Sequence, residues 1–172
     1  MSAVHHFHGY KPWVGSAEEF NRTGLARRRP PRRGTDVDGS ARQAYLDSEM
    51  LPIEVGRWLE KRRHAHRSRT WTQAGDALAW LKQTWLAHPE RGQPFVDGEG
   101  GNYLPLDVKL TYAEQDLRNG VDVAWVYYVG GGLAAYAVVC CPNRFHPAIA
   151  CPLPPARAEG PDQRAVRALS SR

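Results

Sequence analysis

The sequence predicts an α+β domain in which N-terminal helices pack on a small antiparallel sheet centred on a C-terminal hairpin. Two observations predict this class. Segments with helically spaced apolar residues come before the segments rich in β-branched and aromatic residues, and the two kinds do not alternate as they would in a parallel sheet. The 172 residues, 42% apolar and 24% charged, are typical of one globular domain.

The first part of the chain is predicted to be an arm. Residues 1–36 show no sustained helical or strand periodicity and contain RRRPPRR at 27–33. Consecutive prolines favour extended backbone, and neighbouring guanidinium groups repel one another. We therefore expect a flexible, disordered basic arm over residues 1–36, a single globular domain over 37–155 and a tail over 156–172.

Two helices are expected between the arm and residue 60. Ser40 and Gln43 have the capping-box spacing, which predicts a helix over about 41–51. Pro52 is permitted at a first helical position, so a second helix is expected to carry Trp58 and end in the cationic segment 61–69.

A third helix is indicated by the clearest apolar periodicity in the chain. Thr70 and Gln73 repeat the capping-box spacing, and Pro89 ends the segment. Apolar residues separated by three or four positions form one stripe, which predicts a helix with one buried face. The stripe consists of Trp71, Ala74, Leu78, Leu81 and Trp85.

The remaining elements complete a sheet. Residues 104–110 alternate enough to predict a strand, and a short helix follows that Gly120 would end in a left-handed conformation. Residues 121–129 and 133–141 are β-branched and aromatic, and three glycines join them. This pattern predicts a hairpin with a bulged three-residue turn at the centre of a sheet of three or four strands.

Positive charge is concentrated in the first part of the chain. The formal net charge is +5, and residues 1–69 hold 14 Lys and Arg against 8 Asp and Glu. Arginine bridges phosphate oxygens and releases counterions, so this charge predicts a nucleic-acid-associated accessory protein that binds phosphates largely without reading sequence. The predicted contacts are Arg27, Arg28, Arg29, Arg32, Arg33, Lys61, Arg62, Arg63, Arg67 and Arg69. The alternative is a solvated surface rich in arginine because of a GC-rich coding sequence.

A cysteine and histidine cluster near the end of the domain is a candidate zinc site. Cys140, Cys141, His146 and Cys151 lie within twelve residues, and thiolate and imidazole are zinc ligands. Neighbouring strand residues point to opposite faces, so Cys140 and Cys141 are not expected to bind one ion together. Buried apolar cysteines are the alternative. His5, His6 and His8 lie in the expected arm, where ordering entropy opposes binding.

Other function classes remain open. No nucleophile elbow, phosphate loop, dinucleotide fingerprint or HExxH motif occurs, so the sequence favours a non-enzyme. Two alternatives to nucleic-acid binding are a protein-interaction module or inhibitor docking on an acidic partner, and a small zinc-binding domain or metalloenzyme. The three bunched cysteines do not resemble a disulfide framework, and no apolar stretch reaches about 20 residues, so we expect a cytoplasmic protein with no membrane partner.

Overall fold

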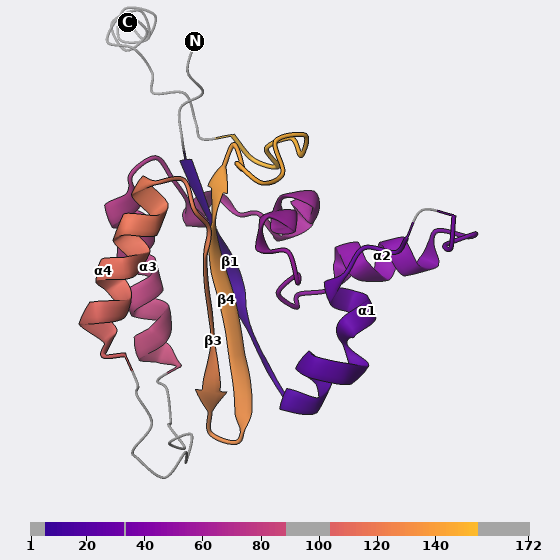
Figure 1. Cartoon of the computed structure of the whole chain (residues 1–172), viewed down its shortest axis with the longest axis horizontal. Helices are drawn as coiled ribbons and strands as arrows, with labels where there is room; N and C mark the ends of the chain where they lie inside the picture. Colours follow the sequence, from indigo (N-terminus) through magenta and orange to yellow (C-terminus); the bar gives the residue numbers. More distant parts are fainter. Residues whose placement is uncertain (1–5, 33, 89–103, 155–172) are drawn as a thin grey trace, which may run out of the picture.

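The computed structural model describes residues 6–32, 34–88 and 104–154, which form a four-stranded antiparallel sheet with helices on both faces (Figure 1). The strands are β1 (His6–Gly15), β2 (Thr70–Trp71), β3 (Val123–Val129) and β4 (Gly132–Cys141), in the order β2-β1-β4-β3. The α-helices are α1 (Leu25–Arg28), α2 (Ser40–Asp47), α3 (Ala74–Ala87) and α4 (Leu106–Arg118). This arrangement confirms the α+β class.

The expected arm is folded over most of its length, and this part of the prediction is wrong. β1 lies between β2 and β4, and its first five residues are buried. Its pairing with β4 is interrupted between Tyr10 and Trp13, where Pro12 lacks a donor for the ladder. A central strand buried on both faces lacks polar and apolar alternation, so no local pattern marks it. Residues 1–5, Arg33 and the predicted tail 156–172 lie outside the described residues.

The segment after β1 is held to the domain by Arg28. The guanidinium donates hydrogen bonds to the backbone carbonyls of Phe20 and Leu51, both at 2.8 Å, and stacks 3.6 Å from the centre of the Phe20 ring. Phe20, in the π-helical turn η1 (Glu19–Thr23), is buried. An arginine expected to contact phosphate therefore fixes the N-terminal segment.

The C-terminal hairpin is confirmed, with a shorter turn than expected. β3 and β4 pair from Val123 opposite Val138 to Val129 opposite Gly132. Gly130 and Gly131, with φ of 49° and 93°, form the two-residue loop. Both positions need positive φ, which glycine adopts without steric cost.

Each face of the sheet contributes to a separate core layer. Side chains from α3 and α4 pack on one face against even-numbered residues of β4, and Figure 1 shows both helices on that side. The other face packs on η1, on the loop around Leu51 and on the 3₁₀ helix η2 (Val55–Glu60). Trp58 of η2 stacks on Tyr10 of β1, with ring centroids 4.5 Å apart. β4 is buried along almost its whole length because both layers cover it.

The first two predicted helices form, but with different ends and caps. α2 spans Ser40–Asp47, and its first N–H groups are accepted by the carboxylates of Asp36 and Asp38, not by the Ser40 hydroxyl. The predicted second helix is the six-residue η2. Acidic side chains from the preceding loop therefore replace the predicted capping box.

α3 confirms the third helix, except that Trp71 belongs to β2. Leu81 is fully buried, and Leu78 and Trp85 pack against the same core. The predicted strand 104–110 is wrong, because residues 106–110 form the beginning of the helix α4. At helical spacing, the side chains of Leu110, Ala113 and Leu117 pack in the core on the sheet, and this burial outweighs the local alternation. Gly120 has a φ of 69°, as expected at the end of this helix.

Candidate metal centre

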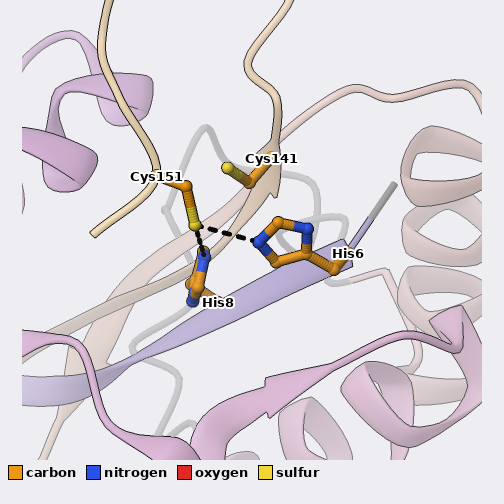
Figure 2. A group of neighbouring side chains, drawn as sticks. All are labelled: His6, His8, Cys141 and Cys151. Carbon is orange, nitrogen blue, oxygen red and sulfur yellow. Dashed lines mark hydrogen bonds between the residues drawn. The ribbon is translucent and has the colours of Figure 1, made fainter. Parts of the chain in front are cut away.

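Four side chains that can ligate a metal ion meet at one end of the sheet (Figure 2). His6 and His8 come from β1, Cys141 ends β4, and Cys151 lies in the segment after β4. One ligand atom from each residue, an imidazole nitrogen or a thiol sulfur, lies within 4.8 Å of all the others. These four residues, called the His₂Cys₂ cluster below, can hold a metal ion.

The pairing of β1 with β4 positions three of the four ligands. His6 lies directly opposite Cys141, and His8 lies opposite Val139. Side chains at alternate positions of a strand share a face, so His6 and His8 lie on the same face of the sheet as Cys141. The antiparallel register therefore assembles the cluster from residues more than 130 positions apart.

Cys151 supplies the fourth ligand from outside the sheet. Its Sγ lies 3.1 Å from His6 Nε2 and 3.5 Å from His8 Nε2. Figure 2 shows the thiol directed toward both imidazoles. His6, His8 and Cys141 are buried, whereas Cys151 is half-buried, so the cluster opens to solvent through Cys151.

A hydrogen-bond chain orients His8 for binding. The Thr70 hydroxyl donates to the backbone carbonyl of His66 at 3.0 Å, and Thr70 Oγ1 lies 3.0 Å from His8 Nδ1. Because the Thr70 hydroxyl proton already bonds the His66 carbonyl, the His8 Nδ1–H must donate to Thr70 Oγ1. This tautomer leaves the Nε2 lone pair directed at the cluster, which is the usual way in which a neighbouring group orients a metal-binding histidine.

Burial sets the protonation of the cluster before any metal binds. Burial, with a smaller contribution from the nearby His6, lowers the pKa of His8 to about 4. Burial, with a contribution from Cys151, raises the pKa of the Cys141 thiol to about 12. Near neutral pH His8 is thus an uncharged ligand, whereas a metal ion must displace the Cys141 proton.

The spacing of the ligand atoms suits a tetrahedral ion. Zn–S and Zn–N bonds of about 2.3 and 2.0 Å give ligand-to-ligand distances of roughly 3.5 Å in a tetrahedron. The Cys151 sulfur already lies 3.1 Å and 3.5 Å from the two imidazole nitrogens. All four ligand atoms lie within 4.8 Å of one another, so no separation exceeds the spacing of such a shell by more than about 1.3 Å.

Two of the four ligands predicted from the sequence do not join the cluster. Cys140 faces the opposite side of the sheet, in the core beneath α3 and α4, where its thiol donates to the Val121 carbonyl at 3.4 Å. Strand alternation causes this separation from Cys141, as expected. His146 is directed toward Glu54, with Nε2 and the carboxylate oxygen 3.7 Å apart.

The turn that follows β4 explains the position of His146. The Asn143 side-chain oxygen accepts the backbone N–H groups of Phe145 and His146, and its amide donates to both oxygens of Asp122. Burial raises the pKa of Asp122, while hydrogen bonds from Cys140 and Asn143 oppose that effect. Asn143 therefore fixes a tight loop that carries His146 away from the cluster and lets the chain return with Cys151.

The ten cations predicted to contact nucleic acid have different environments. Lys61 is fully buried, and its ammonium donates to the carbonyls of Ser48 and Met50, so it cannot reach a phosphate. Arg28 and Arg69 donate to backbone carbonyls and are only half-exposed.

Most of the other predicted cations lie on the surface. Arg27 pairs with Glu19 at 3.3 Å, and Arg63 pairs with Asp47. Among the ten predicted contacts, the exposed cations that form no ion pair with another described residue are Arg29, Arg32, Arg62 and Arg67. Arg33 lies outside the described residues.

His6 and His8 are candidate metal ligands that the sequence-based reasoning considered and argued against. A His-x-His pair on a strand places both imidazoles on one face, but this signal has meaning only if residues 6–15 are recognised as a strand.

Across residues 6–32, 34–88 and 104–154, no helix is both long and apolar enough to cross a membrane. Comparisons with protein-family models, curated proteins and solved structures find no match to this chain.

Proposed function

We propose that this chain binds one zinc ion through the His₂Cys₂ cluster, and that the ion stabilises the fold. The observation that carries the proposal is that one ligand atom from each of four residues lies within 4.8 Å of the others. Two imidazoles and two thiolates form a common set for structural zinc. The ion would join the first strand to the segment that follows the last.

The donor set favours zinc over harder cations. Magnesium and calcium prefer oxygen ligands, whereas thiolates and imidazoles bind softer ions such as Zn²⁺. Two thiolates also balance the two positive charges of the ion, so the filled site would be neutral. Neutrality matters here because three of the ligands are buried, and burying an uncompensated charge is costly.

The coordination favours a structural role over a catalytic one. Catalytic zinc sites use three protein ligands and keep the fourth position for water or substrate. Here the protein supplies four ligands from three separate segments. A zinc concentration 100 times the dissociation constant would add about 2.7 kcal/mol to the stability of the domain.

Metal content in matched cysteine variants tests the proposal. The full chain is purified without chelator, and zinc is measured by plasma mass spectrometry in the wild type, Cys140→Ser and Cys151→Ser. We expect one zinc per chain in the wild type and in Cys140→Ser, because Cys140 faces the other side of the sheet. Cys151→Ser should lose most of the metal while keeping the sheet, since Cys151 is half-buried and lies outside the strands.

Cobalt substitution gives a second readout on the same proteins. Thiolate coordination to Co²⁺ produces a charge-transfer absorption whose intensity grows with the number of sulfur ligands. The absorption per bound cobalt ion, measured with cobalt in excess, should fall by about half in Cys151→Ser and stay unchanged in Cys140→Ser. Zinc well below one equivalent in the wild type, or equal metal loss in both variants, would refute the proposal.

A second proposal is phosphate contact by Arg29, Arg32, Arg62 and Arg67. What supports it is that these four guanidinium groups are exposed and pair with no described carboxylate. Fluorescence anisotropy with a labelled oligonucleotide across a salt series tests it. Replacing all four by alanine should lower the salt slope, by about 0.7 to 0.9 for each phosphate that is no longer neutralised.

Matched arginines provide the control for this experiment. Arg27 and Arg63 are also exposed, but each already pairs with a carboxylate. Replacing Arg27 and Arg63 together by alanine should change the salt slope of binding less than replacing any two of the unpaired arginines by alanine. Negligible binding at low salt, or equal effects of both sets, would end the second proposal.

A further inference from the structure

β3 is an edge strand of the four-stranded sheet that the described residues form. In the sheet order β2-β1-β4-β3, β3 pairs only with β4, and no strand among the described residues pairs with its other side. The opposite edge, β2, is only two residues long. β3 is seven residues long and therefore offers a full row of backbone groups for pairing.

The turn geometry identifies which backbone groups of β3 point outward. A two-residue loop makes its flanking pair, Val129 and Gly132, a hydrogen-bonded pair. Odd-numbered residues of β3 therefore bond to β4, and the N–H and C=O groups of Ala124, Val126 and Tyr128 point away from the sheet. The side chains of these three residues are exposed as well, 45% for Val126 and 43% for Tyr128.

Nothing in the sequence of β3 protects this edge. Proteins guard edge strands with lysine, proline, bulges or short length. The strand VAWVYYV has no charged residue, proline or glycine, and its pairing with β4 has no irregularity. A seven-residue apolar edge of this kind is characteristic of a strand that is paired in the assembled protein.

We infer that β3 pairs with β3 of a second copy of this chain, antiparallel about a two-fold axis at Val126. The two four-stranded sheets then form one continuous sheet of eight strands. This inference does not depend on the zinc site. A second copy is the partner that the residues favour, because an uncharged strand can meet itself without repulsion and a two-fold contact needs a self-complementary surface.

The side chains of β3 complement one another in this register. With Val126 opposite its own copy, the small Ala124 faces the large Tyr128 of the other chain, twice. On the other face the half-buried Trp125 lies opposite Tyr127, which the core beneath α3 and α4 already buries, so the new side-chain contacts come mainly from the exposed face. The outward N–H and C=O groups of Ala124, Val126 and Tyr128 then form six hydrogen bonds between the copies.

Sedimentation velocity of the full chain over a concentration series tests this dimer. We expect a monomer–dimer equilibrium in the wild type. Val126→Lys should weaken it by about 100-fold, because two ammonium groups would face each other in an apolar interface. Val14→Lys is the matched control, since Val14 is a valine on β1 with 50% exposure, and it should leave the dimer unchanged.

Disulfide trapping tests the register and does not depend on the lysine variant folding. A hydrogen-bonded antiparallel pair has a Cα–Cα distance of about 5.5 Å, which fits a disulfide. Under oxidising conditions Val126→Cys should cross-link to itself. Ala124→Cys should not, but it should cross-link when mixed with Tyr128→Cys. Wild type and Val14→Cys give the background from native cysteines.

Several results would overturn the inference. A wild type that remains monomeric at every concentration would show that β3 does not pair with a second copy. A dimer that Val126→Lys leaves intact would place the interface elsewhere. Self-cross-linking of Ala124→Cys as efficient as that of Val126→Cys would exclude the two-fold register.

Discussion

Replacing Lys61 with methionine should remove a pH-dependent contribution to stability. Lys61 has no exposed surface; its ammonium lies 2.8 Å from the Ser48 carbonyl and 3.2 Å from that of Met50. The rings of Tyr45 and Trp58 lie beneath it, with centroids 4.8 Å from Nζ. Burial lowers the pKa of Lys61 from 10.5 to about 7, although the nearby carboxylate of Glu60 opposes this shift.

The sign and size of the effect follow from proton linkage. Between pH 7 and 9 the unfolded chain keeps a proton on Lys61 that the folded chain has released, so stability rises with pH. A shift from 10.5 to about 7 gives a rise of about 2 kcal/mol over this interval. The two carbonyls and two rings favour the charged form, which makes this figure an upper value.

Urea unfolding at pH 7, 8 and 9 measures this contribution. The free energy of unfolding of Lys61→Met is subtracted from that of the wild type, so the titration of cysteines and tyrosines common to both proteins cancels. The free energy of unfolding of the wild type minus that of Lys61→Met should increase as the pH rises from 7 to 9. Arg62→Met, a change at the exposed neighbouring position, should show no such trend. A Lys61→Met difference that does not vary with pH would refute the reasoning.

Three further outcomes are expected. Thr70→Val removes the acceptor for His8 Nδ1 and should weaken zinc binding about 10-fold, measured in competition with a chelating dye. Thr72→Val should leave the zinc affinity unchanged. Equal affinities in the two variants would contradict the role of Thr70 in orienting His8. Gly56→Ala should lower the free energy of unfolding by about 1–3 kcal/mol, because its Cβ would lie 2.7 Å from a neighbouring imidazole, whereas Gly75→Ala in open space should raise it by about 0.5 kcal/mol. Denaturant titrations that show the same sign for both would exclude this steric explanation. Adding a strong chelator should lower the melting temperature of the wild type by several degrees and leave that of Cys151→Ser unchanged.

Elements whose signal is local can be predicted from the sequence. The hairpin joins two apolar segments through glycines, and α3 carries its own apolar stripe, so the pattern indicates both. β1 is not predicted because its partner, β4, lies more than 100 residues away along the chain. As a central strand, β1 is also covered on both faces, so its sequence does not alternate between polar and apolar residues. The segment 104–110 is wrongly predicted as a strand because helical periodicity becomes clear only when residues as far as Leu117 are included.

The candidate site can be predicted only in part for the same reason. Residue type alone identifies Cys141 and Cys151, and strand alternation correctly separates Cys140 from Cys141. The expectation of a flexible terminus argues against His6 and His8, because a metal site there is entropically costly. That reasoning holds for an arm, but the β1–β4 ladder fixes both imidazoles in place and removes that entropic objection.

Zinc X-ray absorption of the purified full chain tests the central claim most directly, because it reports the ligands of the bound ion. The His₂Cys₂ cluster predicts two sulfur ligands at about 2.3 Å and two nitrogen ligands at about 2.0 Å. In the small fraction of zinc that Cys151→Ser retains, the sulfur shell should contain one ligand. A shell made only of nitrogen and oxygen, or one with three sulfurs, would contradict the assignment of His6, His8, Cys141 and Cys151 as the metal site.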